Sequence, residues 1–215
     1  CEEPIMNEHL NLKAVIIDDH PLARLAIRNV LENDGINILA EAGDGVEALR
    51  KINQLHPDIV IIDVDIPLIS GIEVVEKLRK MQFTKSIIVV SAKNDFFYGK
   101  RSAEAGANGF ISKKEGMANI LYAIHAAQSG YSYFPFSLNG FVGNISNEQE
   151  MLLSLSSQEI KVMRAILNGA DNMQIASDMH ISNKTVSTYK KRFMEKLGCH
   201  SLMELFSFAS RNKIG

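Results

Sequence analysis

Five polar side chains recur in the first half of the chain, each directly after a short apolar run. They are Asp18, Asp19, Asp63, Ser91 and Lys113. Three carboxylates that converge repel one another unless a cation lies among them, and oxygen ligands of this type suit a hard divalent ion. We therefore expect Mg²⁺ among Asp18, Asp19 and Asp63, with Lys113 and Ser91 close enough to contact a bound phosphoryl group. Nucleophilic attack by the Asp63 carboxylate on phosphorus is the reaction that this arrangement predicts.

A second interpretation of the same residues is purely structural, because acidic side chains at strand ends are often solvated or cap a helix. For any one of these residues that interpretation is as good as the functional one. Five polar residues at five matching places favour a common site.

The elements that must position these side chains appear as alternating strand and helix patterns. Short apolar runs predict five strands, at residues 14–17, 38–40, 59–62, 87–90 and 109–112. Helical periodicity predicts crossover helices at residues 22–31, 46–52, 72–78 and 120–127, and a weaker helix at 97–105 that contains Gly99. The alternation predicts an α/β domain, a doubly wound five-stranded parallel sheet with helices on both faces. Ligands of such sheets bind beyond the carboxyl ends of the strands, where the five polar residues fall.

Residues 13–128 resemble the receiver domain of two-component response regulators. The resemblance rests on the Asp-Asp pair at 18–19, the stretch Asp-Val-Asp-Ile-Pro-Leu-Ile-Ser-Gly at 63–71, the Ser-Ala pair at 91–92, and Lys113. One residue departs from the pattern. Receivers often carry proline after the lysine, whereas this chain has Lys114, for which a cis peptide bond would cost about 3 kcal/mol.

The resemblance implies a flavodoxin-like fold and a role for each residue of the site. Asp63 is then the phosphoacceptor, and Ser91 and Phe110 are the switch hydroxyl and its coupled aromatic ring. The implied Mg²⁺ ligands are Asp18, Asp19, Asp63 and the backbone carbonyl of Asp65.

A phosphatase of the haloacid-dehalogenase type is the alternative interpretation of Asp63-Val64-Asp65, because that superfamily uses a DxD motif. Its motif follows the first strand and continues with threonine or valine two residues after the second aspartate. Here the motif follows the third strand, and Pro67 occupies that position. We therefore predict that the protein is not an enzyme.

The end of the chain differs from the first half in charge. From residue 151 onward the chain has nine basic and five acidic residues, although the whole chain carries a net charge of −2. Helices are predicted at residues 158–167, 172–179, 183–197 and 202–211, the first of them starting at Ser156 or Ser157 with Glu159.

Residues 130–152 predict a connector. Gly130, Pro135, Gly140 and Gly143 interrupt it, and its aromatic residues should pack in part on a domain: Tyr131, Tyr133, Phe134, Phe136 and Phe141.

The apolar spacing of residues 175–197 predicts two helices packed across a tight turn, as in a helix-turn-helix. On the second helix Lys184, Ser187, Thr188 and Lys191 share one outer stripe, flanked by Lys190 and Arg192. Such a stripe suits a DNA major groove. A lysine-rich solvated face is the alternative for an isolated helix, but the preceding helix and the positive charge favour DNA.

Residues 153–212 resemble the LuxR-type helix-turn-helix of the NarL/FixJ class. Its motifs here are Leu-Ser-Ser-Gln-Glu at 155–159, Ile-Ala at 175–176 and Lys-Thr-Val-Ser-Thr-Tyr at 184–189. Residues 182–190 and Tyr-Phe-Pro at 133–135 are similar to the branch that contains BvgA and EvgA. The resemblance adds Thr185 to the DNA-contacting residues.

Together these features predict four segments: a leader or expression remnant at residues 1–12, a receiver at 13–129, a linker at 130–152 and a DNA-binding domain at 153–215. The expected function is a cytoplasmic transcriptional regulator controlled by phosphorylation. Its expected partners are a histidine kinase or phosphorelay protein, duplex DNA, a second copy in a homodimer and RNA polymerase, with no membrane. A protein-interaction module that never touches DNA is the remaining alternative, and salt-sensitive binding to duplex DNA separates the two. Cys1 and Cys199 predict neither a disulfide nor a zinc site.

Overall fold

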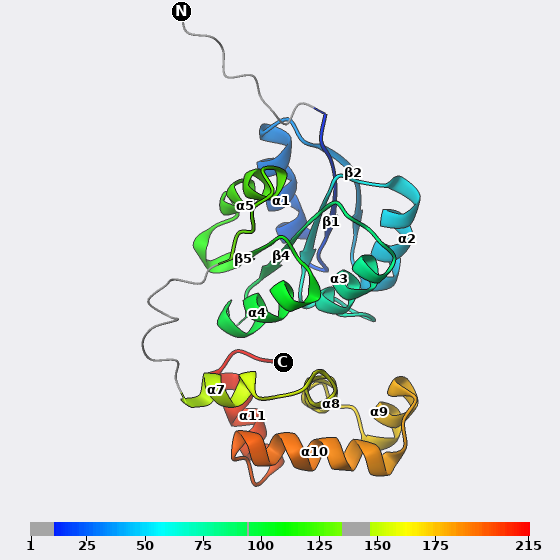
Figure 1. The fold of residues 1–215 in the computed structure, drawn as a ribbon, viewed down its shortest axis with the longest axis vertical. Coiled ribbons are helices and arrows are strands. Elements are labelled where there is room, and N and C mark those ends of the chain that lie inside the picture. The colour runs from blue at the N-terminus through cyan, green and yellow to red at the C-terminus, as the bar shows by residue number, and fades with distance from the viewer. Residues whose placement is uncertain (1–10, 94, 135–146) are drawn as a thin grey trace, which may run out of the picture. The chain divides into compact units, whose positions relative to one another are not determined.

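The computed structural model describes residues 11–93, 95–134 and 147–215, and the chain forms two compact units, Cys1–Pro135 and Phe136–Gly215 (Figure 1). Each unit is built around its own core. Within the described ranges, no helix is both long enough and apolar enough to span a bilayer.

The first unit is a five-stranded parallel sheet with the strand order β2-β1-β3-β4-β5. Its strands are β1 (Lys13–Ile17), β2 (Asn37–Ala42), β3 (Ile59–Asp63), β4 (Ser86–Ser91) and β5 (Gly109–Ser112). Its helices are α1 (Pro21–Asn33), α2 (Gly45–Leu55), α3 (Gly71–Lys80), α4 (Asp95–Ala105) and α5 (Asn119–Gln128). Helices α1 and α5 cover one face of the sheet, and α2, α3 and α4 cover the other (Figure 1). The predicted doubly wound parallel sheet is confirmed.

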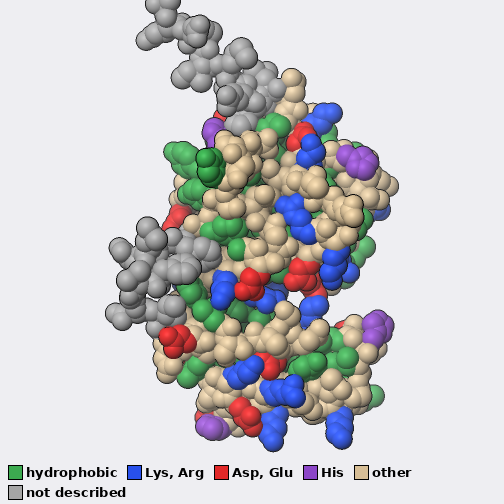
Figure 2. Space-filling model, viewed as in Figure 1, with side chains coloured by type: hydrophobic (Ala, Val, Ile, Leu, Met, Phe, Trp, Pro, Cys, Tyr) green, Lys and Arg blue, Asp and Glu red, His purple; other side chains and the backbone are tan. Residues whose placement is uncertain are grey.

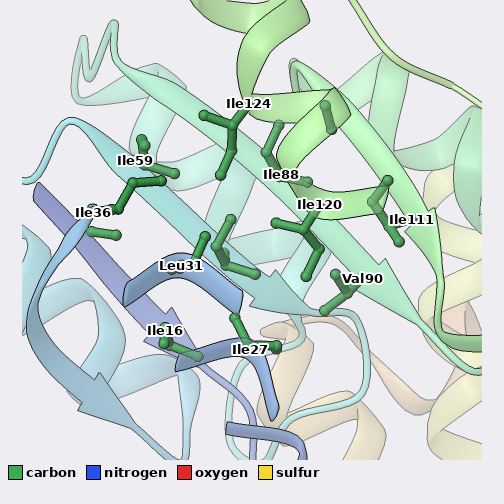
Figure 3. Packing of buried hydrophobic residues seen from close by; sticks show 13 residues of the cluster. Ile16, Ile27, Leu31, Ile36, Ile59, Ile88, Val90, Ile111, Ile120 and Ile124 are labelled. Atoms are coloured by element: carbon green, nitrogen blue, oxygen red, sulfur yellow. The ribbon is translucent and has the colours of Figure 1, made fainter. Parts of the chain in front are cut away.

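The sheet is apolar on both faces because helices cover both. Every residue of β3 and β4 is buried, which is typical of the central strands of a parallel sheet. On the α1 and α5 side, Leu31 and Ile124 pack against strand residues such as Ile88 (Figure 3). The carboxyl ends of β1 and β3 are therefore held in place by a dry, close-packed core.

Helix α4 begins earlier than the pattern predicts, at Asp95 instead of residue 97. Gly99 lies inside it and is buried, next to Phe97 and Tyr98, which are 2% and 1% exposed. Burial of two aromatic side chains outweighs the low helix propensity of one glycine.

The segment after α5 returns to the sheet. The Tyr133 N–H donates to the Asn108 carbonyl at 3.0 Å, and the Phe110 N–H donates to the Tyr133 carbonyl at 2.8 Å. Tyr133 packs against the core, as predicted for part of the connector, whereas Tyr131 is 72% exposed. The predicted packing of Phe136 and Phe141, and the turns at Pro135, Gly140 and Gly143, lie outside the described residues.

The second unit is all-helical. Its helices are α7 (Asn147–Leu153), α8 (Ser157–Leu167), α9 (Asn172–Met179), α10 (Asn183–Leu197) and α11 (Leu202–Arg211). Ser156 is the N-cap of α8 and forms a capping box with Glu159, which decides between the two predicted starts. The second predicted domain is confirmed as helical.

Helix α7 was not predicted, because its residues fall in the segment expected to be a linker. It has seven residues and buries only Leu152, so it leaves no periodic pattern. The helix is held by contacts far along the chain: Glu148 accepts hydrogen bonds from Arg211 at 2.8 Å and from the Asn212 side chain at 2.7 Å. Residues 147–152 thus pack with the helical unit.

Candidate functional site

A buried acidic pocket forms where β1, β3 and β5 end. Asp18 follows β1, Asp63 is the last residue of β3, and Lys113 follows β5. Asp18 is fully buried and Asp63 is 4% exposed. The Lys113 Nζ donates to Asp18 Oδ2 at 2.6 Å and makes a second short contact with Asp63 Oδ2. Three residues distant in the sequence therefore converge on one point, as the strand-end argument predicts.

Asp19 lies at the solvent side of the pocket and is 34% exposed in its side chain. Its Oδ1 is 2.7 Å from His20 Nδ1, and the same ring nitrogen is 3.2 Å from Asp18 Oδ1. The His20 backbone N–H also donates to Asp18 Oδ1 at 2.9 Å. Sequence reasoning missed His20, although its position directly after the acidic pair was a visible signal.

Burial and charge set the protonation of the pocket. Burial raises the pKa of Asp63 to about 6, against the opposing effect of Lys113. Burial acts in the same direction on Asp18, but hydrogen bonds from Lys113 and His20 outweigh it, so the pKa of Asp18 is lowered. Burial would lower the pKa of Lys113, yet its bonds to Asp18 and Asp63 raise it. Lys113 is therefore protonated and positively charged. Ionisation of Asp63 costs more free energy than ionisation of Asp18.

The loop after β3 fixes the Asp63 side chain. The Asp65 N–H donates to Asp63 Oδ1 at 2.8 Å, while Oδ2 faces Lys113. Gly71 closes the loop, since its N–H donates to the Val64 carbonyl at 2.9 Å. A Cβ at Gly71 would lie 2.0 Å from the Asp63 carbonyl oxygen, so only glycine fits. The chain thus orients the carboxylate before any ligand arrives.

The residues expected to act as a switch are both buried on one face of the sheet. Ser91 and Phe110 are each 0% exposed. In the β4–β5 register Val89 lies opposite Phe110, and Ser91 lies opposite Ser112, so Ser91 and Phe110 project toward the same side. The Ser91 Oγ accepts a hydrogen bond from the Lys93 N–H at 3.0 Å, and Lys93 Nζ is 3.6 Å from Asp65 Oδ2.

The donor set of the pocket fits a hard divalent cation. The carboxylates of Asp18 and Asp63 are almost fully buried with a single ammonium group between them, and Asp19 adds a third carboxylate at the mouth. Oxygen donors of this number and charge suit Mg²⁺. The Asp65 backbone lies against the pocket through its N–H. Lys114 occupies the position after the lysine at which receivers often carry proline, and its N–H donates to Ser112 Oγ at 3.4 Å. Every peptide bond among the described residues is trans.

The second unit presents α10 as a basic face. Val186, Phe193 and Leu197 are its buried residues. The predicted stripe lies on the opposite side: Lys184, Ser187, Thr188, Lys191 and Arg192 are exposed, and Thr185 and Lys190 are half-buried. Lys and Arg side chains gather over this part of the unit (Figure 2).

Helix α10 is anchored at both ends. Ser182 caps it by accepting from the Thr185 N–H at 3.1 Å. Near the other end, Lys196 Nζ bonds Glu159 Oε2 at 2.9 Å and the Ser154 carbonyl at 3.0 Å. Lys196 thus ties α10 to α8. A rigid, basic helix face is suited to docking in a nucleic-acid groove.

Two family models match the chain. Residues 14–125 match the response regulator receiver domain, and residues 153–209 match the bacterial regulatory proteins of the luxR family. The chain is 64% identical over 204 residues to the DNA-binding transcriptional activator EvgA of Escherichia coli K12, covering 95% of this chain and 100% of EvgA. It is 34% identical over 205 residues to BvgA of Bordetella pertussis, described as a putative positive transcription regulator of virulence factors, covering 94% and 98%.

Solved structures of the response regulator RcsB share the fold. The RcsB of Salmonella typhimurium is 25% identical with a TM-score of 0.76, and 95% of this chain and 99% of that chain are covered. A structure of two RcsB dimers bound to two parallel DNAs is 26% identical with a TM-score of 0.58, and the shares covered are 93% and 98%.

Proposed function

The chain belongs to the two-component response regulators of the NarL/FixJ class, and from this membership we propose that phosphorylation of Asp63 controls DNA binding by its helical unit. The observation that carries the proposal is the convergence of Asp18, Asp63 and Lys113 at the ends of three strands. The ammonium group between the two buried carboxylates neutralises one of their negative charges. The other negative charge remains for attack on phosphorus.

In the proposed reaction a carboxylate oxygen of Asp63 forms a bond to phosphorus, and the bond from phosphorus to the donor breaks. For a phosphohistidine donor this is the P–N bond, and the released imidazole nitrogen takes up a proton. Asp63 Oδ1 keeps its hydrogen bond from the Asp65 N–H, so Oδ2 is the atom that attacks phosphorus. Lys113 then pairs with the phosphoryl oxygens in place of Oδ2.

Mg²⁺ bound by Asp18, Asp19, Asp63 and the Asp65 carbonyl would neutralise the charge of the incoming phosphoryl group. The chain's own groups position the rest. Ser91 lies on the neighbouring strand with one hydroxyl hydrogen to donate, because its accepted bond comes from Lys93. Movement of that hydroxyl toward the phosphoryl group would couple to Phe110 on the same sheet face, which is the proposed switch.

We propose that the regulated partner is duplex DNA, bound by a homodimer. EvgA is a DNA-binding transcriptional activator, and RcsB dimers bind DNA. The proposed contacts are Lys184, Thr185, Ser187, Thr188, Lys190, Lys191 and Arg192. The donor is a histidine kinase or phosphorelay protein, RNA polymerase is a further partner, and the compartment is the cytoplasm. The receiver spans residues 13–129 and the DNA-binding domain 153–215.

The phosphatase alternative receives little support. In that mechanism the second aspartate of the DxD motif acts as general acid. Asp65 has a side chain that is 50% exposed, and its Oδ2 lies 3.6 Å from Lys93 Nζ. The DxD motif also follows β3 and continues with Pro67, which departs from the pattern of that superfamily. We propose a regulator that is not an enzyme, and the relatives described above are transcriptional regulators.

The test is phosphorylation of the full chain with a small phosphodonor and Mg²⁺, followed by mass spectrometry to locate the label. Label is expected on Asp63 alone, and chelating the metal should suppress it. DNA affinity is then measured with and without phosphodonor across a salt series, with Asp63→Asn as the variant and Asp58→Asn, an aspartate at the opposite end of β3, as the matched control. Label retained in Asp63→Asn, or duplex binding without salt dependence, would overturn the proposal.

The switch has its own test. Ser91→Ala should take up label at Asp63 but respond less in DNA affinity or self-association than the wild type. Ser70→Ala, which removes a hydroxyl that caps α3 near the same loop, is the control. Equal responses of wild type and Ser91→Ala would exclude coupling through Ser91 and Phe110.

A further inference from the structure

The hydroxyl groups on the exposed side of α10 are already engaged within the protein. Thr185 Oγ1 lies 2.8 Å from Ser182 Oγ. Ser187 Oγ accepts a bond from the Asn172 side chain at 3.4 Å. Thr188 Oγ1 donates to the Lys184 carbonyl at 2.9 Å. The surface expected to face DNA therefore has its hydroxyl groups oriented in advance.

Thr188 is the residue for which this orientation matters most. A hydroxyl has one hydrogen, and a carbonyl oxygen can only accept, so the Thr188 hydrogen is used in the bond to the Lys184 carbonyl. With Oγ1 turned onto the helix backbone, the methyl group is left as the outer part of an exposed side chain. Thr188 presents an apolar tip at the centre of the outer stripe.

The neighbours of this tip on the helix face are cations. Lys184 and Lys191 lie four residues before and three residues after Thr188, so all three share one face. Both lysines are exposed, and an ammonium group can only donate hydrogen bonds. They suit phosphates or the O6 and N7 acceptors of guanine, and neither competes for an apolar group in the groove.

We propose that Thr188 reads a thymine through its methyl group, an assignment that rests on the proposed DNA-binding function. In the major groove the C5-methyl of thymine is the one apolar group that a base presents, and it distinguishes A·T from the other pairs. A methyl-to-methyl contact needs no hydrogen-bond donor from Thr188, which matches the engaged hydroxyl.

The experiment removes the two methyl groups one at a time. The full-length protein, treated with phosphodonor and Mg²⁺, selects a duplex from a random pool, and each thymine of one half-site is then replaced by deoxyuridine. One replacement should weaken wild-type binding about fourfold, the change expected when one methyl-sized group, about 0.8 kcal/mol, is no longer buried. Thr188→Ser should lose the same factor on the thymine duplex and show no further loss with deoxyuridine.

Thr188→Val tests the hydroxyl directly, because valine keeps a methyl group and has no oxygen. It should retain the sensitivity to deoxyuridine at the same position. Thr84→Ser, which removes a methyl group from an exposed threonine of the receiver, is the matched control and should also retain it.

Two results would refute the assignment while the proposed function stands: wild-type binding that is selective but unchanged by deoxyuridine at every thymine, or Thr188→Ser that keeps the full sensitivity. A Thr188→Val protein that loses its base preference would show that the hydroxyl reads the base, which also overturns the proposal. Absence of any sequence-selective binding by the wild type would refute the proposed function itself.

Discussion

Neutralising Asp63 should stabilise the metal-free receiver, and the gain should grow with pH. Burial raises the pKa of this carboxyl from 3.8 to about 6. The folded state therefore binds more protons than the unfolded state between these values, and the stability of the wild type falls as pH rises through that window. Asparagine has no charge to bury, so Asp63→Asn escapes this loss.

The magnitude follows from the shift. At 1.36 kcal/mol per pKa unit, a displacement of roughly two units corresponds to about 3 kcal/mol of unfavourable ionisation above pH 7. At pH 4.5, where the folded carboxyl is protonated, the cost falls to about 1 kcal/mol. Asp63→Asn should therefore be more stable than the wild type by up to about 3 kcal/mol at pH 8, and by much less at pH 4.5.

Hydrogen exchange in a chelating buffer is the assay, because peptides from β3 and β4 report opening of the receiver separately from the helical unit. At pH 8 the variant should exchange these amides about 100-fold more slowly, if they open only by global unfolding. Asp19→Asn is the control: it removes a charge from the same pocket at a side chain that is 34% exposed, where a smaller effect is expected. A variant no more stable than the wild type at pH 8, or a gap that does not narrow toward pH 4.5, would refute the argument from burial.

Three further perturbations have defined outcomes. Gly71→Ala should destabilise the receiver by more than about 2 kcal/mol in urea unfolding, because its Cβ would lie 2.0 Å from the Asp63 carbonyl oxygen. Glu159→Gln should cost the helical unit about 1.5–3 kcal/mol, since it weakens a buried charged bond to Lys196. Burial would raise the pKa of Glu159, but the bonds from Lys196 and the capping box outweigh burial and lower the pKa. The stabilisation is therefore present above pH 4.5 and is lost as the pH falls further. Acid titration followed by circular dichroism would show this loss. Lys113→Met should destabilise the metal-free receiver by about 3–5 kcal/mol, measured by the same exchange experiment, and Mg²⁺ should restore part of the loss; no recovery with Mg²⁺ would argue against a cation site here.

The parallel sheet and the convergence of the acidic pocket could be predicted because both follow from periodicity. Alternating strands and helices leave few topologies, and strand ends of a parallel sheet meet at one edge. Periodicity alone therefore places Asp18, Asp63 and Lys113 together. What periodicity could not supply is which atoms touch: the ammonium bridge to both carboxylates depends on side-chain reach.

The features that sequence reasoning missed depend on contacts between distant residues. Helix α7 has too few residues and too little buried surface to show a pattern, and it is fixed by Arg211 and Asn212 near the other end of the unit. Helix α4 starts at Asp95, two residues before the buried pair Phe97 and Tyr98. Local propensity is a weak guide where tertiary packing decides.

The charge count of the pocket links its stability to its function. Asp18, Asp19 and Asp63 carry three negative charges, and Lys113 supplies one positive charge, which leaves a net charge of −2 when all are ionised. Phosphorylation replaces the Asp63 carboxylate by a group of about −2, so the deficit deepens to about −3. A single ammonium group cannot hold that charge in a buried site, whereas one divalent ion brings the total near −1. Burial of these charges lowers the stability of the metal-free receiver, and the same burial makes phosphorylation of Asp63 depend on the cation. The extra stability of Asp63→Asn and the metal dependence of labelling in the wild type therefore have one physical cause.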